Sequence, residues 1–172
     1  MVGVGNTGTL LVDDIVSLLE RFGCAIPVYA LALAYDSEVP LPPFLGLGTV
    51  EESRQWVDAE GAQVADYLWN PAEFKLFDIP ELSLNSEKYE EIWQQLLLEV
   101  GAGAAYVAAR DIVIQAAQSL NRQDWSGVLA TSDNFVVYAV NIDLSDLSET
   151  LPACVDAGKL KTLREQNLLP AL

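Results

Sequence analysis

Two long apolar runs constrain the fold more than any other feature of this sequence. Residues 26–35 read IPVYALALAY and stay almost continuously apolar until Asp36 ends the run. A run of this kind is typical of a strand that is covered on both faces. Residues 135–142 read FVVYAVNI and combine β-branched with aromatic side chains, which favour a second strand. We therefore expect a small sheet built around these two strands.

Helix signals surround the two runs. Apolar residues recur at helical spacing over residues 10–22, and residues 49–56 begin with the Thr-x-x-Glu spacing of a capping box. Residues 70–73 begin with Asn-Pro, which suits the start of a short helix. Residues 86–120 lack proline and predict a long helical block, broken in two near Gly101, and residues 159–168 predict a last short helix.

The remaining segments complete an α+β interpretation. We expect a short strand over residues 44–48 and a hairpin partner for the second apolar run over residues 128–130. The chain has 172 residues, of which 51% are hydrophobic and 20% charged, a balance typical of one packed domain. The sequence thus predicts a single α+β domain over residues 1–172, with a small β-sheet flanked by helices and packed against residues 86–120.

The charge of the chain restricts its partners. Twenty-five Asp and Glu residues against nine Lys and Arg leave a formal net charge of −16, which repels phosphates and anionic lipid headgroups. We therefore expect neither nucleic acid nor membrane as a partner. The apolar stretch at residues 101–117 contains Arg110 and Asp111, so we expect no membrane-spanning helix. No secretory signal is visible, and we expect a cytoplasmic protein.

The residue types that usually carry catalysis are scarce. The chain has no histidine, and Cys24 and Cys154 lie among apolar neighbours without the spacing of metal ligands. The glycine pattern at residues 3–8 resembles a dinucleotide-binding loop, but only two residues precede it, too few for the strand that such a loop requires. We therefore expect no cofactor, metal or catalytic residue, and a flexible, dispensable segment at residues 1–8.

Acidic residues follow both predicted strands. Asp36 and Glu38 come directly after the first strand, and Asp143, Asp146 and Glu149 come after the second. If the two strands run parallel, their ends meet at one edge of the sheet and the five acids form one surface. If the strands run antiparallel, the two clusters are separated. Such carboxylates can bind a divalent metal or a basic protein surface, and we favour the protein contact.

Three segments and the end of the chain resemble a known family. They read VYALAL at residues 28–33, WNPAEF at residues 69–74, DNFVVYAV at residues 133–140 and NLLP at residues 167–170. In this order they resemble an uncharacterised bacterial family, the domain of unknown function numbered four thousand three hundred and three. Such families are similar in setting to immunity proteins that neutralise bacterial toxins, including the SUKH group of compact α+β proteins. The resemblance implies a partner protein and supplies no catalytic residue.

These observations lead to one favoured function and two alternatives. We expect a non-enzymatic protein that binds or neutralises a basic protein, such as a toxin domain, through the acids at the strand ends. The first alternative is a hydrolase or transferase that uses carboxylates, with or without a divalent metal ion. The second is a structural or regulatory subunit. The sequence leaves the identity of the partner and the oligomeric state open.

Overall fold

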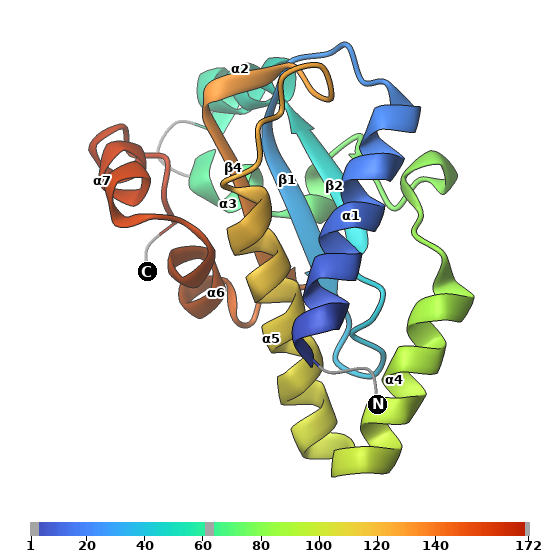
Figure 1. The fold of residues 1–172 in the computed structure, drawn as a ribbon. Coiled ribbons are helices and arrows are strands. Elements are labelled where there is room, and N and C mark those ends of the chain that lie inside the picture. Colours follow the sequence, from blue (N-terminus) through green and yellow to red (C-terminus); the bar gives the residue numbers. More distant parts are fainter. Residues whose placement is uncertain (1–3, 61–63, 171–172) are drawn as a thin grey trace.

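Four strands form one mixed sheet in the order β3-β2-β1-β4 (Figure 1). They are β1 (Val28–Tyr35), β2 (Phe44–Thr49), β3 (Leu76–Phe77) and β4 (Thr131–Asn141). The structure is a computed structural model that describes residues 4–60 and 64–170. β1 pairs antiparallel with β2 and parallel with β4, so the two apolar runs lie side by side. The predicted single α+β domain, with a small sheet flanked by helices, is confirmed.

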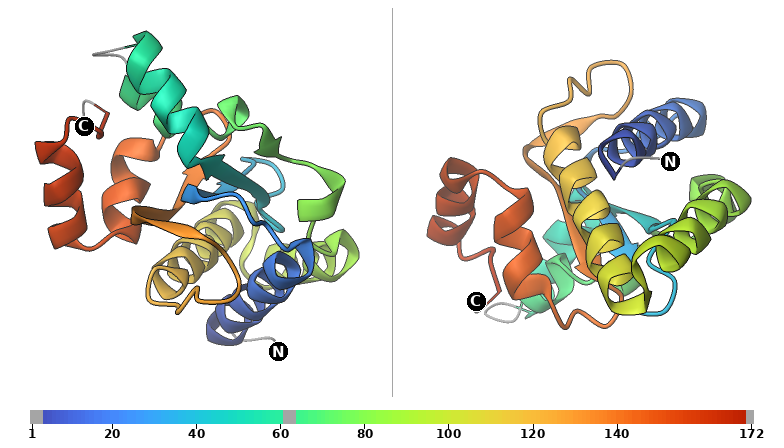
Figure 2. Two further views of the ribbon diagram at one scale, coloured as in Figure 1. Left: turned by 90° about the horizontal axis from the view of Figure 1, so that it is seen from above. Right: turned by 60° about the horizontal axis from the view of Figure 1, so that its bottom comes forward.

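Helices cover both faces of the sheet and the outer edge of β4 (Figure 2). The helices on one face are α1 (Val4–Phe22), α4 (Ser86–Val100) and α5 (Ala102–Leu120). The other face carries α2 (Val50–Glu60), α3 (Val64–Leu68) and the short 3₁₀ helix η2 (Pro71–Glu73). A second 3₁₀ helix, η3 (Pro80–Leu82), leads into α4, while α6 (Leu147–Cys154) and α7 (Ala157–Glu165) lie beside β4.

Side-chain size differs between the two faces of the sheet. On the face toward α2 and α3, Ala30 lies opposite Gly48, and Ala32 lies opposite Gly46. A Cβ atom on Gly48 would come within 2.7 Å of the Tyr29 ring, and one on Gly46 within 2.9 Å of a neighbouring aromatic ring. Small residues thus make room for aromatic rings. The large residues Leu31 and Leu33 alternate with these alanines and fill the face toward α5.

The predicted core and the predicted helix start at residue 49 are both confirmed. Both apolar runs form strands of the core, in which the side chains of Leu31, Leu33, Val137 and Val140 are fully buried. At the start of α2, Glu52 donates its N–H to the Thr49 hydroxyl at 3.2 Å, and the Thr49 N–H donates to the Glu52 carboxylate at 3.0 Å. This reciprocal pair is the capping box that the sequence predicts.

Side chains cover the outer edge of β4. Asn121, just after α5, donates to the Val137 carbonyl at 2.6 Å and accepts from the Val137 N–H at 2.8 Å. Three further side chains bond to every second residue along this edge: Lys159 donates to the Phe135 carbonyl, Cys154 accepts from the Ala139 N–H, and Asp146 accepts from the Asn141 N–H. These contacts occupy backbone groups that would otherwise be available to pair with another strand.

The amino-terminal segment differs from the prediction. Residues 4–8, expected to be flexible, form the start of α1, and residues 1–3 lie outside the described residues. Thr7 is buried and falls on the same helical stripe as Leu11 and Ile15, since each is four residues from the next. Packing of this stripe against the domain therefore outweighs the low helix propensity of the two glycines at residues 5 and 8.

Other departures concern short elements. The expected hairpin partner at residues 128–130 is wrong, because this segment forms a turn and the Ala130 carbonyl accepts from the Val28 N–H of β1 at 2.8 Å. α3, β3 and α6 were not predicted. α6 contains Pro152, which normally argues against a helix, but the burial of Leu151 and Cys154 holds this turn against the sheet.

Candidate functional site

The parallel pairing of β1 and β4 brings the two acidic clusters to the same edge of the sheet. The register aligns Leu31 with Val137 and continues to Tyr35 beside Asn141, where both strands end. Asp36 and Asp143 follow these last paired residues closely in the sequence. The sequence left open whether the two strands run parallel, and the structure shows that they do. The side chains of the five acids, however, have different surroundings.

Two of the predicted acids are held by Arg110 of α5. The Arg110 guanidinium donates through Nε to Asp146 at 3.2 Å and through Nη2 to Glu149 at 2.9 Å. Asp146 also accepts from the Tyr35 hydroxyl and from the Asn141 N–H. The Asp146 side chain is only 14% exposed. Asp146 therefore joins β4, α5 and α6, and its carboxylate is not free for a partner.

The Tyr35 hydroxyl remains a donor throughout the usual pH range. Burial raises the pKa of Tyr35 well above its ordinary value, and the hydrogen bond to the Asp146 carboxylate raises this pKa further. The phenol is therefore protonated at neutral pH and donates to Asp146. Arg110 in turn donates to the Tyr35 oxygen at 3.2 Å. The network sets one guanidinium against the two carboxylates of Asp146 and Glu149, so Arg110 compensates part of their negative charge.

The remaining predicted acids face solvent. Asp143 is exposed, and its side-chain hydrogen bond to Ser145 lowers the pKa of the carboxyl group. The Asp36 carboxylate closes a turn after β1 by accepting from the Glu38 N–H at 2.6 Å. Glu38 itself is exposed, and its side chain makes no hydrogen bond or ion pair among the described residues. Asp36, Glu38 and Asp143 therefore keep uncompensated negative charge at the edge of the sheet.

A groove of about 450 Å³ lies beside Asp36 and Glu38. Its charged lining residues are Asp36, Glu38, Asp78 and Glu90, and no Lys or Arg lines it among the described residues. Its accessible apolar surface comes from the β1–β2 connection, the start of β2 and the segment before α4, namely from Val39, Pro42, Phe44 and Leu84. We call this feature the acidic groove.

Local sequence explains how the walls of the acidic groove arise. Pro40, Pro42 and Pro43 hold the β1–β2 connection extended and deny it helix. On the opposite wall, Asn85 caps α4 by accepting from the Lys88 N–H at 3.3 Å, which fixes the start of the helix that carries Glu90. The groove thus lies between a proline-rich connection and the first turns of α4.

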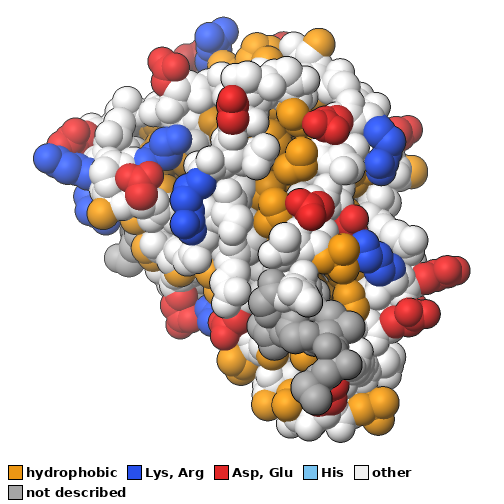
Figure 3. All heavy atoms as spheres, in the orientation of Figure 1, with side chains coloured by type: hydrophobic (Ala, Val, Ile, Leu, Met, Phe, Trp, Pro, Cys, Tyr) orange, Lys and Arg blue, Asp and Glu red, His pale blue; other side chains and the backbone are white. Residues whose placement is uncertain are grey.

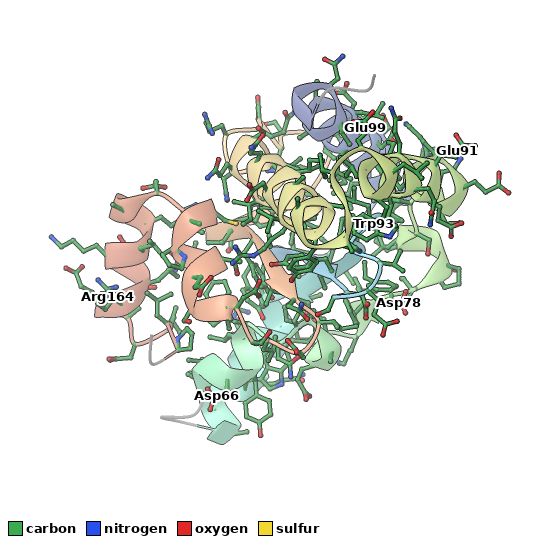
Figure 4. All side chains as sticks on the ribbon, turned by 90° about the horizontal axis from the view of Figure 1, so that it is seen from below. Asp66, Asp78, Glu91, Trp93, Glu99 and Arg164 are labelled. Atoms are coloured by element: carbon green, nitrogen blue, oxygen red, sulfur yellow. The ribbon has the colours of Figure 1, made fainter. Side chains whose placement is uncertain are left out.

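Asp78 and Glu90 were missed by sequence reasoning. Asp78 follows β3, a strand of two residues that gives no detectable pattern, and has a left-handed φ of 48°. Figure 4 shows Asp78 on the other side of the buried Trp93 from Glu99, so the acids near α4 belong to separate surfaces. Glu90 looks like any other solvated helix acid in the sequence. Only the packing of α4 against the β1–β2 connection brings it to the groove.

Three further features concern metals, thiols and membranes in the part of the chain that the structure describes. Within it, no group of three His, Cys, Asp or Glu side chains could hold a metal ion. Burial raises the pKa of Cys154 to about 11, so this thiol stays protonated at neutral pH, and Cys24 is half-buried. No helix in residues 4–60 or 64–170 is long and apolar enough to cross a membrane. The metal-dependent enzyme stays an untested alternative.

Comparison with known proteins returns no relative: no family model, no curated protein and no solved structure matches this chain. The resemblance to the uncharacterised bacterial family therefore stays a prediction.

Proposed function

We propose that this protein is a non-enzymatic binding protein whose acidic groove receives a basic segment of a partner protein. The observation that carries the proposal is the composition of the groove. Its charged lining residues are all acidic, and they stand above an apolar floor in a cavity of about 450 Å³. A volume of this size can take one or two large side chains rather than a whole helix.

The chemistry of lysine and arginine fits this lining. Both side chains can bury their aliphatic stems on apolar surface while the charged head reaches a polar rim. Val39 is exposed and supplies apolar surface close to Glu38, so one bound side chain can contact both Val39 and Glu38. Electrostatic attraction speeds the encounter and rejects acidic partners, and burial of the stems adds residence time.

The distribution of charge over the surface supports the same partner class. Figure 3 shows Lys and Arg side chains gathered over α7, at the left of that view. The acidic groove is built from the β1–β2 connection, the β3–η3 segment and α4, which lie across the sheet from α7 (Figure 1). With a formal net charge of −16 and a groove whose charged lining residues are all acidic, the protein attracts a basic partner. Neutralisation of a toxin domain is one form of this proposal.

The first test uses a defined probe. The probe is a short amphipathic peptide of alternating leucine and lysine, and its glutamate counterpart is the reference. Binding is measured by calorimetry at low and at physiological salt. We expect the lysine peptide to bind, the glutamate peptide not to bind, and the affinity to fall as salt rises.

Matched variants separate the groove from the overall charge. The double variant Glu38→Lys with Glu90→Lys reverses two acids of the groove, while Glu20→Lys with Glu99→Lys makes the same change of net charge at exposed positions outside it. We expect at least a tenfold loss of affinity for the groove variant and about a twofold loss for the control. Equal losses in both variants would assign binding to net charge alone and refute the groove as the site.

One observation favours the structural-subunit alternative. Leu98, Val100 and Val107 are exposed at the corner where α4 meets α5, and Leu98 is 87% exposed. Apolar side chains show at this lower end of the molecule in Figure 3. A contiguous apolar patch often marks a contact between proteins. Sedimentation velocity tests this alternative: a stable oligomer that Leu98→Lys disperses would support it.

A further inference from the structure

The outer side of α4 is not covered by any other element of the described chain (Figure 1). On the inner side of α4, Ile92, Trp93 and Leu96 are buried against the domain. Figure 4 shows Glu91 on the opposite side of the helix from Trp93. A shallow hollow of about 550 Å³ follows the outer side and is lined by Glu87, Glu90, Glu91, Gln94, Gln95 and Leu98. We call this surface the α4 face.

Four exposed residues of the α4 face form one stripe along the helix, namely Glu87, Glu91, Gln94 and Leu98. Successive members of the stripe are three or four residues apart, so they share one side of the helix over about three turns, or about 16 Å. Leu98, at the end of the stripe, is 87% exposed. A leucine side chain with so much apolar surface in water gains free energy when another molecule covers it.

The negative charges of the α4 face are uncompensated. The charged residues that line it are all glutamates, and no Lys or Arg lines it among the described residues. Glu87 lies three residues before Glu90 and four before Glu91, positions at which like charges on a helix surface repel each other. The basic residue of α4, Lys88, is held toward α1 by its ion pair with Asp14 at 2.6 Å. Cationic groups of another molecule would relieve the repulsion between these glutamates.

Charge complementarity decides among the molecules that could cover the α4 face. A second copy docked through the same face would add three further glutamates and no cation. An anionic lipid surface would be repelled in the same way. A helix with lysine or arginine at the same spacing places its cations opposite Glu87 and Glu91 and an apolar side chain opposite Leu98, because two packed helices align their side chains over several turns.

We propose that the α4 face docks a basic amphipathic helix of a partner protein, with lysine or arginine opposite Glu87 and Glu91 and one large apolar side chain on Leu98. This inference rests on the proposed function, because Glu90 lines both the α4 face and the acidic groove and joins them into one surface. The groove takes one or two side chains of the segment next to the docked helix, and the α4 face takes the helix itself.

The probe is an alanine-rich helical peptide with lysine at positions i, i+4 and i+7 and leucine at i+11, which is the spacing of the stripe on α4. A second peptide with the reverse order of these residues serves the opposite orientation. A proline at the centre of each peptide keeps its charge and breaks its helix. Calorimetry at low salt should show that one order binds and that its proline form binds about tenfold more weakly. Equal binding of the helical and proline forms, or no binding of either order, would overturn the proposal.

Surface variants locate the helical peptide on α4. Glu87→Gln with Glu91→Gln should weaken its binding about tenfold, and Leu98→Ala about fivefold. The matched control is Glu20→Gln with Glu73→Gln, which makes the same change of net charge at exposed positions that line neither the α4 face nor the acidic groove. We expect this control to change the affinity by less than about twofold. Equal losses in the two double variants would assign binding to net charge and refute the α4 face as the site.

Glu38→Lys separates this inference from the groove proposal, since Glu38 lines the acidic groove and not the α4 face. If Glu38→Lys abolishes binding of the short leucine–lysine peptide while the helical peptide ignores the change at Glu87 and Glu91, the groove proposal holds and this inference fails. If the helical peptide depends on Glu87 and Glu91 while neither peptide responds to Glu38→Lys, the α4 face holds and the groove fails. An oligomer in sedimentation velocity that excludes the helical peptide would assign the α4 face to a second copy and refute the inference.

Discussion

Replacement of Asp146 by alanine should destabilise the fold by about 2–5 kcal/mol. The Asn141 N–H, which donates to Asp146 at 2.8 Å, would lose its acceptor in a residue that is 3% exposed. An unsatisfied buried donor costs about 1–3 kcal/mol. The variant also removes the hydrogen bond from the Tyr35 hydroxyl to Asp146, which is worth about 1 kcal/mol. Arg110 keeps Glu149 and partial solvent access, so the lost ion pair adds only about 0–1 kcal/mol.

Urea denaturation followed by circular dichroism measures this cost, with two comparison variants. Asp146→Asn keeps a side-chain oxygen for the Asn141 N–H, so we expect a loss of about 1–2 kcal/mol. Glu149→Gln changes a side chain that is 74% exposed, and we expect a loss below about 0.5 kcal/mol. The midpoint should shift at constant slope if the native and denatured states keep their compactness.

The order of the three variants decides between two roles for Asp146. If Asp146 mainly covers the edge of β4, the loss of stability is largest for Asp146→Ala, smaller for Asp146→Asn and smallest for Glu149→Gln. In that case Asp146→Asn also leaves the affinity for the lysine peptide unchanged. If Asp146 belongs to the binding surface, stability changes little and affinity falls. A cost of Asp146→Ala below about 0.5 kcal/mol would refute the structural role.

Three further predictions concern the core. Burial raises the pKa of four tyrosines above the value near 10 that they have in the unfolded chain, namely Tyr29, Tyr35, Tyr89 and Tyr138. Their contribution to stability is therefore complete below pH 10 and is lost above it, and the free energy of unfolding should fall by up to about 1.4 kcal/mol per pH unit for each tyrosine. We expect the phenolate absorbance to appear at the pH at which the protein unfolds. Ionisation of these tyrosines at a pH at which the protein is still folded would contradict this prediction. Gly48→Ala should destabilise the fold by about 1–3 kcal/mol, because the added Cβ crowds the Tyr29 ring. Gly8→Ala should stabilise the fold by about 0.5–1 kcal/mol, because its Cβ has open space in α1. Thermal unfolding of both variants checks whether each stability change has the expected sign. Leu33→Ala should cost about 2–5 kcal/mol in urea denaturation, and an unchanged midpoint would contradict its full burial.

Local sequence patterns determined the elements that are long or chemically marked. The apolar run at residues 28–35 forms a fully buried strand, because no charged side chain interrupts it over eight residues. The Thr49–Glu52 spacing located the start of α2, since a capping box needs only groups within one helical turn. The positions of Asp36 and Asp143 after the two strands were likewise visible in the sequence, because they depend only on where each strand ends.

Tertiary structure decided which of these acids remain free. Sequence order gives no sign that Arg110, more than thirty residues before Asp146, forms ion pairs with both Asp146 and Glu149, because these contacts depend on α5 lying across the end of β4. The same holds for the acidic groove, where Glu90 approaches Glu38 through the packing of α4. The start of α1 followed packing rather than propensity, as the buried Thr7 shows. Charge and strand position are local properties of the chain, whereas the pairing of a charge and the shape of a cavity are set by contacts between segments distant in sequence.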